Sequence, residues 1–160
     1  QQVAKKLSGF DVKIIAYDPF AKSTNNVEIV DRETIFKTAD YVMVHLPAIP
    51  ETKHSIGSAE FKMMKNDAYL INMARGVIIV ESELVTALKN GDIAGAALDV
   101  FEEEPLPVTN PLVGLDNVLL TPHIASNTIE TKAQMATDAT KDIVRVLQGK
   151  KPEANVNQLN

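Results

Sequence analysis

The chain has 160 residues, of which 45% are hydrophobic and 23% charged, and its net charge is -5. That is enough apolar material for one sizeable core in a globular domain. The acidic balance argues against a nucleic-acid or anionic-membrane surface, no apolar run approaches the roughly 20 residues of a membrane span, and without cysteine there are no disulfides or thiolate metal sites. A cytoplasmic protein is the simplest interpretation.

Strand-like and helix-like segments alternate along the chain. Residues 1–7 are typical of the middle of a helix that ends at Gly9, residues 12–17 of a strand, and residues 31–38 of a short helix. Further strands are predicted at 41–46, 68–72, 94–100 and 118–121, further helices at 80–89 and about 128–147, and a turn after Ser58. Because several of the strands are apolar on both faces, the pattern predicts an α/β fold with a parallel sheet covered by helices.

Three polar groups stand where strand-like runs end: Arg75, the glutamates 102–104, and His123. An arginine, a carboxylate and a histidine are what a site needs to hold an organic acid and move a proton near pH 7. Each group also has a structural interpretation, because Arg75 could cap a strand at the surface and His123 could be a polar residue that ends one. The residue pattern alone does not separate the three glutamates.

Asp18 follows the strand predicted at 12–17. In dinucleotide-binding domains an acidic residue in this place binds the adenosine ribose, about 20 residues after a glycine-rich phosphate loop. Counting back that distance reaches Gln1 or beyond it, so we expect the loop and the first strand to lie outside this sequence. The alternative is that Asp18 is an ordinary turn residue beside Pro19.

Several motifs in a fixed order resemble the D-isomer-specific 2-hydroxyacid dehydrogenase family. They are Tyr17-Asp18-Pro19, His45-Leu46-Pro47, Asn72-Met73-Ala74-Arg75-Gly76, Leu98-Asp99-Val100-Phe101-Glu102-Glu103-Glu104-Pro105 and Thr121-Pro122-His123. The resemblance implies a Rossmann-like parallel sheet with helices on both faces, here without its first strand and glycine-rich loop. Residues 1–126 would form an incomplete NAD-binding domain. Residues 127–160 would form a long connecting helix and a segment returning toward a substrate domain.

The resemblance agrees with the chemistry of the three polar groups. Arg75 would anchor the substrate carboxylate, because a guanidinium offers paired donors and stays charged. His123 would be the general acid and base. The family's catalytic carboxylate directly precedes a proline, which selects Glu104 before Pro105. Glu104 would orient the imidazole of His123, while the other two glutamates would form a solvated edge.

The resemblance also implies cofactor contacts. Asp99 would accept a hydrogen bond from the nicotinamide carboxamide, although a strand-end aspartate bound by loop amides is the alternative. Pro47 and Ala74 would line the cofactor through their backbones. Asp18 favours NAD(H) over NADP(H), because a carboxylate repels a 2'-phosphate.

The expected function is hydride transfer between NAD(H) and a D-2-hydroxyacid or 2-keto acid, with 3-phosphoglycerate as one substrate. A glyoxylate or hydroxypyruvate reductase and a non-catalytic NAD-sensing, corepressor-like module are the alternatives. The 160-residue piece alone is expected to be inactive. The family's dimerisation implies a homodimer, with residues 77–80 and the next helix as a contact. His45 in a core or cleft and His54 at the surface lack metal-ligand spacing, so no metal is expected.

Overall fold

The computed structural model describes residues 2–21 and 27–154. The chain divides into two compact units, residues 1–122 and 123–160. Residues 155–160, the end of the segment predicted to return toward a substrate domain, lie outside the described residues. The assignment of 1–126 and 127–160 to different domains of a larger enzyme stays a prediction.

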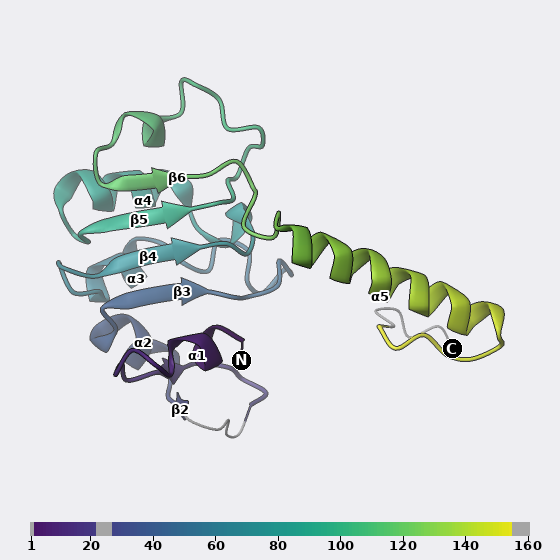
Figure 1. The fold of residues 1–160 in the computed structure, drawn as a ribbon. Helices are drawn as coiled ribbons and strands as arrows, with labels where there is room; N and C mark the ends of the chain where they lie inside the picture. Colours follow the sequence, from purple (N-terminus) through teal and green to yellow (C-terminus); the bar gives the residue numbers. More distant parts are fainter. Residues whose placement is uncertain (1, 22–26, 155–160) are drawn as a thin grey trace. The chain divides into compact units, whose positions relative to one another are not determined.

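The first unit is built on a four-stranded parallel sheet in the order β3-β4-β5-β6 (Figure 1). Its strands are β3 (Tyr41–Val44), β4 (Tyr69–Asn72), β5 (Gly95–Leu98) and β6 (Val118–Leu120). In this register Val44 lies beside Asn72, Asn72 beside Leu98, and Leu98 beside Leu120. The segments that follow the strands therefore leave the sheet at one edge, and the predicted α/β fold with a Rossmann-like parallel sheet is confirmed.

A second, two-stranded parallel sheet pairs β1 (Ile15–Ala16) with β2 (Glu28–Ile29). The strand predicted at 12–17 is thus shorter than expected, and β2 was not predicted at all. Two residues, one of them a glutamate, carry no alternating apolar pattern, so β2 depends on its pairing with β1. Helix α1 (Gln2–Leu7) occupies the predicted position near the start of the chain.

Three helices follow one another along one face of the four-stranded sheet: α2 (Arg32–Thr38), α3 (Ser58–Met63) and α4 (Glu81–Asn90) (Figure 1). The carboxylate of Asp31 accepts the N–H of Thr34 and so caps the start of α2, whereas Gly91 adopts a left-handed conformation, with φ 73°, at the end of α4. The turn predicted after Ser58 is wrong, because this segment forms α3. Its apolar pattern is too short to distinguish a helix from a turn, and burial of Phe61 in the core stabilises the helix.

An arginine–glutamate pair joins α2 to α3. Arg32 Nη1 donates to Glu60 Oε1 at 2.8 Å, and the guanidinium lies over the ring of Phe36 at 5.1 Å from its centroid. Burial alone raises the pKa of Glu60, but the hydrogen bond from the Gly57 N–H and the Arg32 guanidinium outweigh it, so the pKa lies below its ordinary value. The pair therefore favours an ionised Glu60 in the folded protein.

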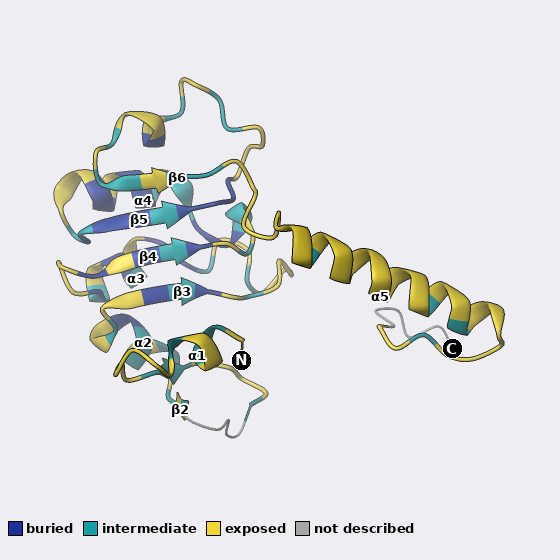
Figure 2. Ribbon diagram, viewed as in Figure 1, coloured by how far each residue is buried: buried dark blue, intermediate teal, exposed yellow. Residues whose placement is uncertain are grey.

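The hydrophobic core lies between the sheet and these helices (Figure 2). Alternate strand residues such as Val42, Leu70 and Leu98 are buried there. On the opposite face of the sheet, Tyr41 and Tyr69 are exposed and stack with their ring centroids 5.7 Å apart. Ile78 and Ile79, within the stretch 77–80 expected to contact a second copy, are instead buried in the chain's own core.

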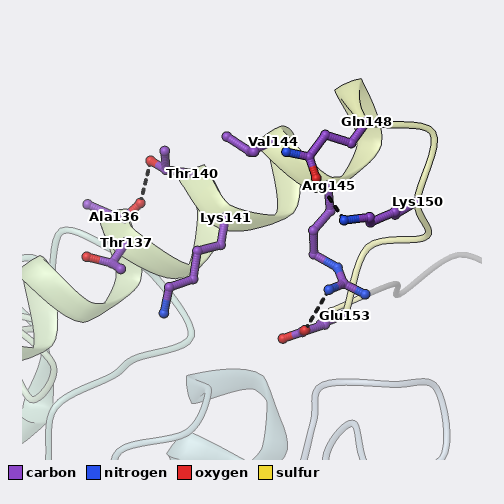
Figure 3. Close-up of a pocket in the computed structure, with 9 residues that line it drawn as sticks. All are labelled: Ala136, Thr137, Thr140, Lys141, Val144, Arg145, Gln148, Lys150 and Glu153. Carbon is purple, nitrogen blue, oxygen red and sulfur yellow. Dashed lines mark hydrogen bonds and ion pairs between the residues drawn. The ribbon is translucent and has the colours of Figure 1, made fainter.

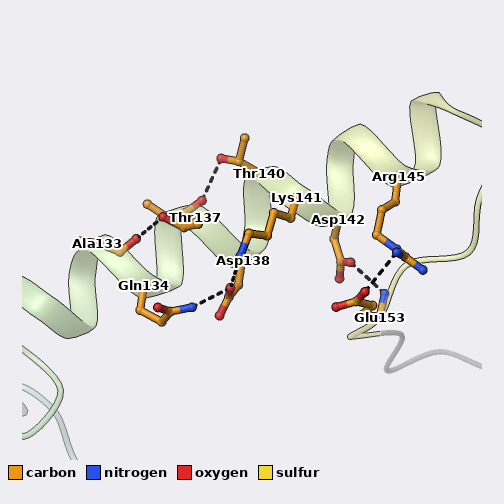
Figure 4. A network of polar contacts seen from close by, with 10 residues as sticks. Ala133, Gln134, Thr137, Asp138, Thr140, Lys141, Asp142, Arg145 and Glu153 are labelled. Atoms are coloured by element: carbon orange, nitrogen blue, oxygen red, sulfur yellow. Dashed lines mark hydrogen bonds and ion pairs between the residues drawn. The ribbon is translucent and has the colours of Figure 1, made fainter.

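The second unit consists mainly of α5 (Ile129–Leu147), close to the helix predicted at 128–147. The hydroxyl of Thr128 accepts the N–H of Thr131 at its start. The chain then turns back, and Asp142 accepts a hydrogen bond from the N–H of Glu153 at 2.8 Å (Figure 4). It also accepts one from the N–H of Ala154 at 3.0 Å. These bonds lower the pKa of Asp142. Within 2–21 and 27–154, the structure contains no helix long and apolar enough to cross a membrane.

Candidate functional site

The turn after β4 is closed by the side chain of Asn72, which is 1% exposed. Its Oδ1 accepts the N–H of Ala74 at 3.0 Å, and its Nδ2 donates to the carbonyl of Arg75 at 3.0 Å. Because both ends of the amide are used, the backbone of residues 72–75 is held in one conformation. Asn72 therefore sets the positions of two predicted site residues.

Arg75 is exposed at the end of this turn. Its Nη1 donates to the carbonyl of Ala74 at 2.6 Å, which uses one of the five N–H donors of a guanidinium. Ala74 packs against the core as a partly buried residue. The cation is therefore presented to solvent from a base that is fixed by Asn72 and the core, as an anchor for an anionic group requires.

Gly76 brings the Arg75 turn against the segment that follows β5. A Cβ atom at Gly76 would lie 1.9 Å from the carbonyl carbon of Phe101 and 2.6 Å from the amide nitrogen of Glu102. Such distances are impossible for any side chain, so the two backbones can touch only through a glycine. The contact places the turn of Arg75 directly beside the segment that carries Glu104.

Glu104 lies at the end of that segment, and its Oε1 accepts the N–H of Phe101 at 3.0 Å. The peptide bond between Glu104 and Pro105 is cis. Glu102 differs from the predicted solvated edge, because its Oε1 accepts the N–H of Glu81 and lies 3.1 Å from Nε2 of His54. The structure thus separates Glu104 from Glu102 by their contacts, which the residue pattern did not do.

Asp99 follows β5 and is 3% exposed. Its Oδ1 accepts the hydroxyl of Thr121 at 2.6 Å, and its N–H donates to the carbonyl of Asn72 at 3.0 Å. Thr121 is a further candidate residue that the sequence analysis did not single out, although it stands in the Thr-Pro-His motif. A threonine after a strand gives no signal until the fold places it beside a buried carboxylate.

The remaining cofactor candidates lie at the surface. Asp18 follows β1, and its Oδ1 accepts the N–H of Phe20 at 2.9 Å, as a turn aspartate does. Pro47 is exposed, and its carbonyl accepts the hydroxyl of Thr52 at 2.5 Å. His45 is exposed rather than buried in a core, and His54 is exposed as predicted.

His123 is the first residue of the second unit. It is exposed and has a φ of 53°, in the left-handed region that is uncommon for residues other than glycine. This conformation turns the chain sharply after Pro122. A backbone held in a sparsely populated region is a feature that functional residues often show.

A groove of about 630 Å³ lies along α5 and the segment after it (Figure 3). Its lining mixes apolar, hydroxyl and charged side chains: Ala136, Thr137, Thr140, Lys141, Val144, Arg145, Gln148, Lys150 and Glu153. It contains none of the predicted site residues. Its arginine, Arg145, already forms an ion pair, with Nη1 3.0 Å from Oε1 of Glu153. We therefore place the candidate site at the carboxyl edge of the sheet.

Across the described ranges, no group of three His, Asp or Glu residues is arranged to hold a metal ion.

The sequence model for the NAD-binding domain of the D-isomer specific 2-hydroxyacid dehydrogenases matches residues 1–125. Among curated relatives, a glyoxylate reductase of Thermofilum pendens is 48% identical over 160 residues, which cover 97% of this chain and 47% of the relative. A D-3-phosphoglycerate dehydrogenase of Methanocaldococcus jannaschii is 43% identical over 165 residues, which cover 100% of this chain and 31% of the relative.

Among solved structures, the NAD-complexed D-isomer specific 2-hydroxyacid dehydrogenase of Lactobacillus delbrueckii ssp. bulgaricus has a TM-score of 0.87 and 33% identity. The match covers 97% of this chain and 51% of that protein. The chain thus spans about half of the length of the glyoxylate reductase and of the solved dehydrogenase, and 31% of the D-3-phosphoglycerate dehydrogenase. It belongs to the D-isomer specific 2-hydroxyacid dehydrogenase family.

Proposed function

We propose that the full-length protein is an oxidoreductase that transfers a hydride between NAD(H) and a D-2-hydroxyacid or its 2-keto acid. One observation carries the proposal: Gly76 packs the turn of Arg75 onto the Phe101–Glu102 backbone, beside the segment of Glu104. A cation and a carboxylate are thereby brought to one edge of a parallel sheet. In folds of this kind, ligands bind at the carboxyl ends of the strands.

The polar residues that follow β5 and β1 fit a nicotinamide dinucleotide. The buried carboxylate of Asp99, held by Thr121, is suited to accept a hydrogen bond from a carboxamide. Asp18, at the end of β1, is suited to ribose hydroxyls and disfavours a 2'-phosphate, so NAD(H) is preferred over NADP(H). Pro47 and Ala74 would line the cofactor through their backbones. When bound, NAD(H) supplies or accepts the hydride.

Three residues would carry the rest of the chemistry. Arg75 would bind the carboxylate of the keto acid and orient its carbonyl. His123, as imidazolium, would donate a proton to the carbonyl oxygen during reduction, and as imidazole it would take that proton back during oxidation. Glu104 would bind the second ring nitrogen of His123 and favour its charged form.

The relatives' names support a small 2-keto acid or 2-hydroxyacid as the substrate. The glyoxylate reductase and the D-3-phosphoglycerate dehydrogenase are 48% and 43% identical to the chain. A glyoxylate or hydroxypyruvate reductase and a dehydrogenase acting on 3-phosphoglycerate are therefore the two substrate classes proposed. Both substrate classes share the 2-oxo or 2-hydroxy carboxylate that Arg75 would bind.

A substrate panel tests the proposal on the full-length protein. NADH oxidation is measured with glyoxylate, hydroxypyruvate, pyruvate and 3-phosphohydroxypyruvate, and NAD⁺ reduction with the D and L forms of the hydroxyacids. We expect turnover with at least one keto acid, a preference for the D form, and a preference for NADH over NADPH. Binding of NADH without turnover of any acid would contradict the proposed enzymatic activity and would support an NAD-sensing module.

Two further properties belong to the same proposal. We propose a homodimer, as the family resemblance implies, and a cytoplasmic location. Light scattering of the full-length protein tests the dimer, and a monomer at micromolar concentration would contradict it.

The 160-residue chain alone is expected to bind NADH weakly, so micromolar affinity measured on it would contradict that expectation.

A further inference from the structure

Two glutamates exchange hydrogen bonds with each other's backbone at the carboxyl edge of the sheet. The N–H of Glu81, the first residue of α4, donates to Oε1 of Glu102 at 3.3 Å. In return, the N–H of Glu102 donates to Oε2 of Glu81 at 3.2 Å. This reciprocal pair joins the start of α4 to the segment after β5, across 21 residues of sequence.

Each carboxylate also has a contact with a further segment. Asn110 Nδ2 donates to Oε1 of Glu81 at 2.6 Å, and His54 Nε2 lies 3.1 Å from Oε1 of Glu102. Asn110 Oδ1 in turn accepts the N–H of Leu112 at 2.9 Å, which fixes the orientation of the amide. We call Glu81, Glu102, Asn110 and His54 the carboxylate clamp, because together they tie four segments of the chain to one point.

The clamp holds the segment that presents Glu104. Phe101, whose N–H donates to Oε1 of Glu104, directly precedes Glu102. Gly76 packs on the backbone of the same two residues, Phe101 and Glu102. Fixing Glu102 therefore fixes both the amide that binds the Glu104 carboxylate and the surface on which the Arg75 turn rests.

Glu81 must be a carboxylate to do this. Its Oε1 and Oε2 accept from two different donors, the Asn110 amide and the Glu102 N–H. Glutamine has a single acceptor oxygen and would set its NH₂ group against one of these donors. The loss of one accepted bond and the contact between two donors would loosen the segment.

From these contacts we infer that Glu81 is a positioning residue, which acts through Glu102 on the carboxylate of Glu104. The kinetic consequence rests on the proposed function, whereas the structural consequence does not. Glu83 is a matched control in the same helical turn. It is also a carboxylate, but its Oε2 accepts the N–H of Ser58 on α3 and not a group of the segment after β5.

The kinetic test compares Glu81→Gln with Glu83→Gln in the full-length protein. Glu81→Gln is expected to lower kcat roughly tenfold to a hundredfold, with KM for NADH and for the keto acid changed by less than about threefold. Glu83→Gln is expected to leave kcat within about twofold. Equal effects of the two substitutions on kcat would overturn the inference.

A second substitution offers a rescue. In Glu81→Gln with Asn110→Asp, the new carboxylate accepts from the glutamine NH₂, while the glutamine oxygen accepts from the Glu102 N–H. The pair is expected to recover most of kcat. Asn110→Asp alone sets two carboxylates against each other and is expected to lower kcat as Glu81→Gln does, so the test holds even if one single variant folds poorly. A double variant no better than the two single variants would overturn the inference.

Amide hydrogen exchange separates this inference from the proposed function. In Glu81→Gln, exchange across residues 100–105 is expected to rise about tenfold, whereas Glu83→Gln leaves it unchanged and the double variant restores it. If the unsubstituted protein turned over no keto acid, the proposed function would fail and this measurement would still decide the positioning role. Unchanged exchange in Glu81→Gln would refute it.

Discussion

The hydroxyl of Thr121, the residue after β6, donates a 2.6 Å hydrogen bond to the buried carboxylate of Asp99, the residue after β5. The two residues stand directly beyond neighbouring parallel strands, so the sheet itself brings them together. A hydrogen bond to a charged group in a buried place is stronger than one between neutral groups. It fixes the orientation of the carboxylate proposed to bind the nicotinamide carboxamide.

Thr121→Val keeps the shape of the side chain and removes this donor. The Asp99 carboxylate is then less well ordered, and the dissociation constant of NADH for the full-length protein is expected to rise about tenfold, as measured by fluorescence titration. Thr121→Ser keeps the hydroxyl and is the control, with a change of less than about twofold. Equal NADH affinities of the Thr121→Val variant and the unsubstituted protein would show that Asp99 does not need the hydrogen bond from Thr121.

Gly76→Ala tests the contact between the two loops. The new methyl group would overlap the carbonyl carbon of Phe101, so the Arg75 turn must move away. We expect the free energy of unfolding to fall by about 3 kcal/mol or more, measured by urea denaturation. Gly114→Ala is the matched control, because a Cβ there meets nothing within 4 Å, and its effect is expected to stay below about 1 kcal/mol. Similar losses in both variants would mean that the close approach is not needed.

From the Arg32–Glu60 pair we expect the free energy of unfolding to depend on pH in the acidic range. Because the pKa of Glu60 is lower in the folded protein than its ordinary value of 4.5, ionised Glu60 stabilises the fold above that pH. The contribution is lost as the pH falls below 4.5 and through the lower, folded-state pKa. Glu60→Gln is therefore expected to destabilise the protein at pH 7, and the difference from the unsubstituted protein is expected to shrink toward pH 3.

Urea denaturation at both pH values measures this difference. Glu51→Gln, in an exposed loop, is the control and is expected to change the free energy of unfolding by less than about 0.5 kcal/mol at either pH. A difference for Glu60→Gln that stays constant from pH 7 to pH 3 would refute the stabilising role of the ionised form.

Arg75→Lys tests the carboxylate anchor. Lysine keeps the charge but loses the paired donors, so the KM for the keto acid is expected to rise about tenfold or more, while the affinity for NADH stays within about twofold. Steady-state kinetics and NADH titration measure the two effects. Arg145→Lys, on α5, is the control for an arginine outside the proposed site. An Arg75→Lys variant with the original KM would exclude the proposed role of Arg75 in binding the substrate carboxylate.

Much of the fold follows from local patterns. Apolar runs located β3, β4, β5 and β6, because a buried parallel strand leaves a signal that does not depend on its neighbours. The short elements were harder to predict. β2 exists through pairing with β1, and α3 is stabilised by burial of Phe61, and neither property appears in a window of a few residues.

The residues of the candidate site were likewise only partly predictable from the sequence. Arg75, Glu104 and His123 were predicted because polar residues at strand ends stand out against apolar runs and because they match family motifs. Thr121 and Glu81 were missed, since each acts through a partner more than 20 residues away in sequence. Such pairs become visible only when the register of the sheet brings strand ends together.

The central claim is that His123 carries the proton in a hydride transfer. The most direct test is His123→Gln in the full-length protein, with kcat for keto-acid reduction and the dissociation constant of NADH measured in parallel. We predict that kcat falls at least about a hundredfold while NADH affinity stays within about twofold, because glutamine cannot exchange a proton near pH 7. A variant that retained the original kcat would contradict the account.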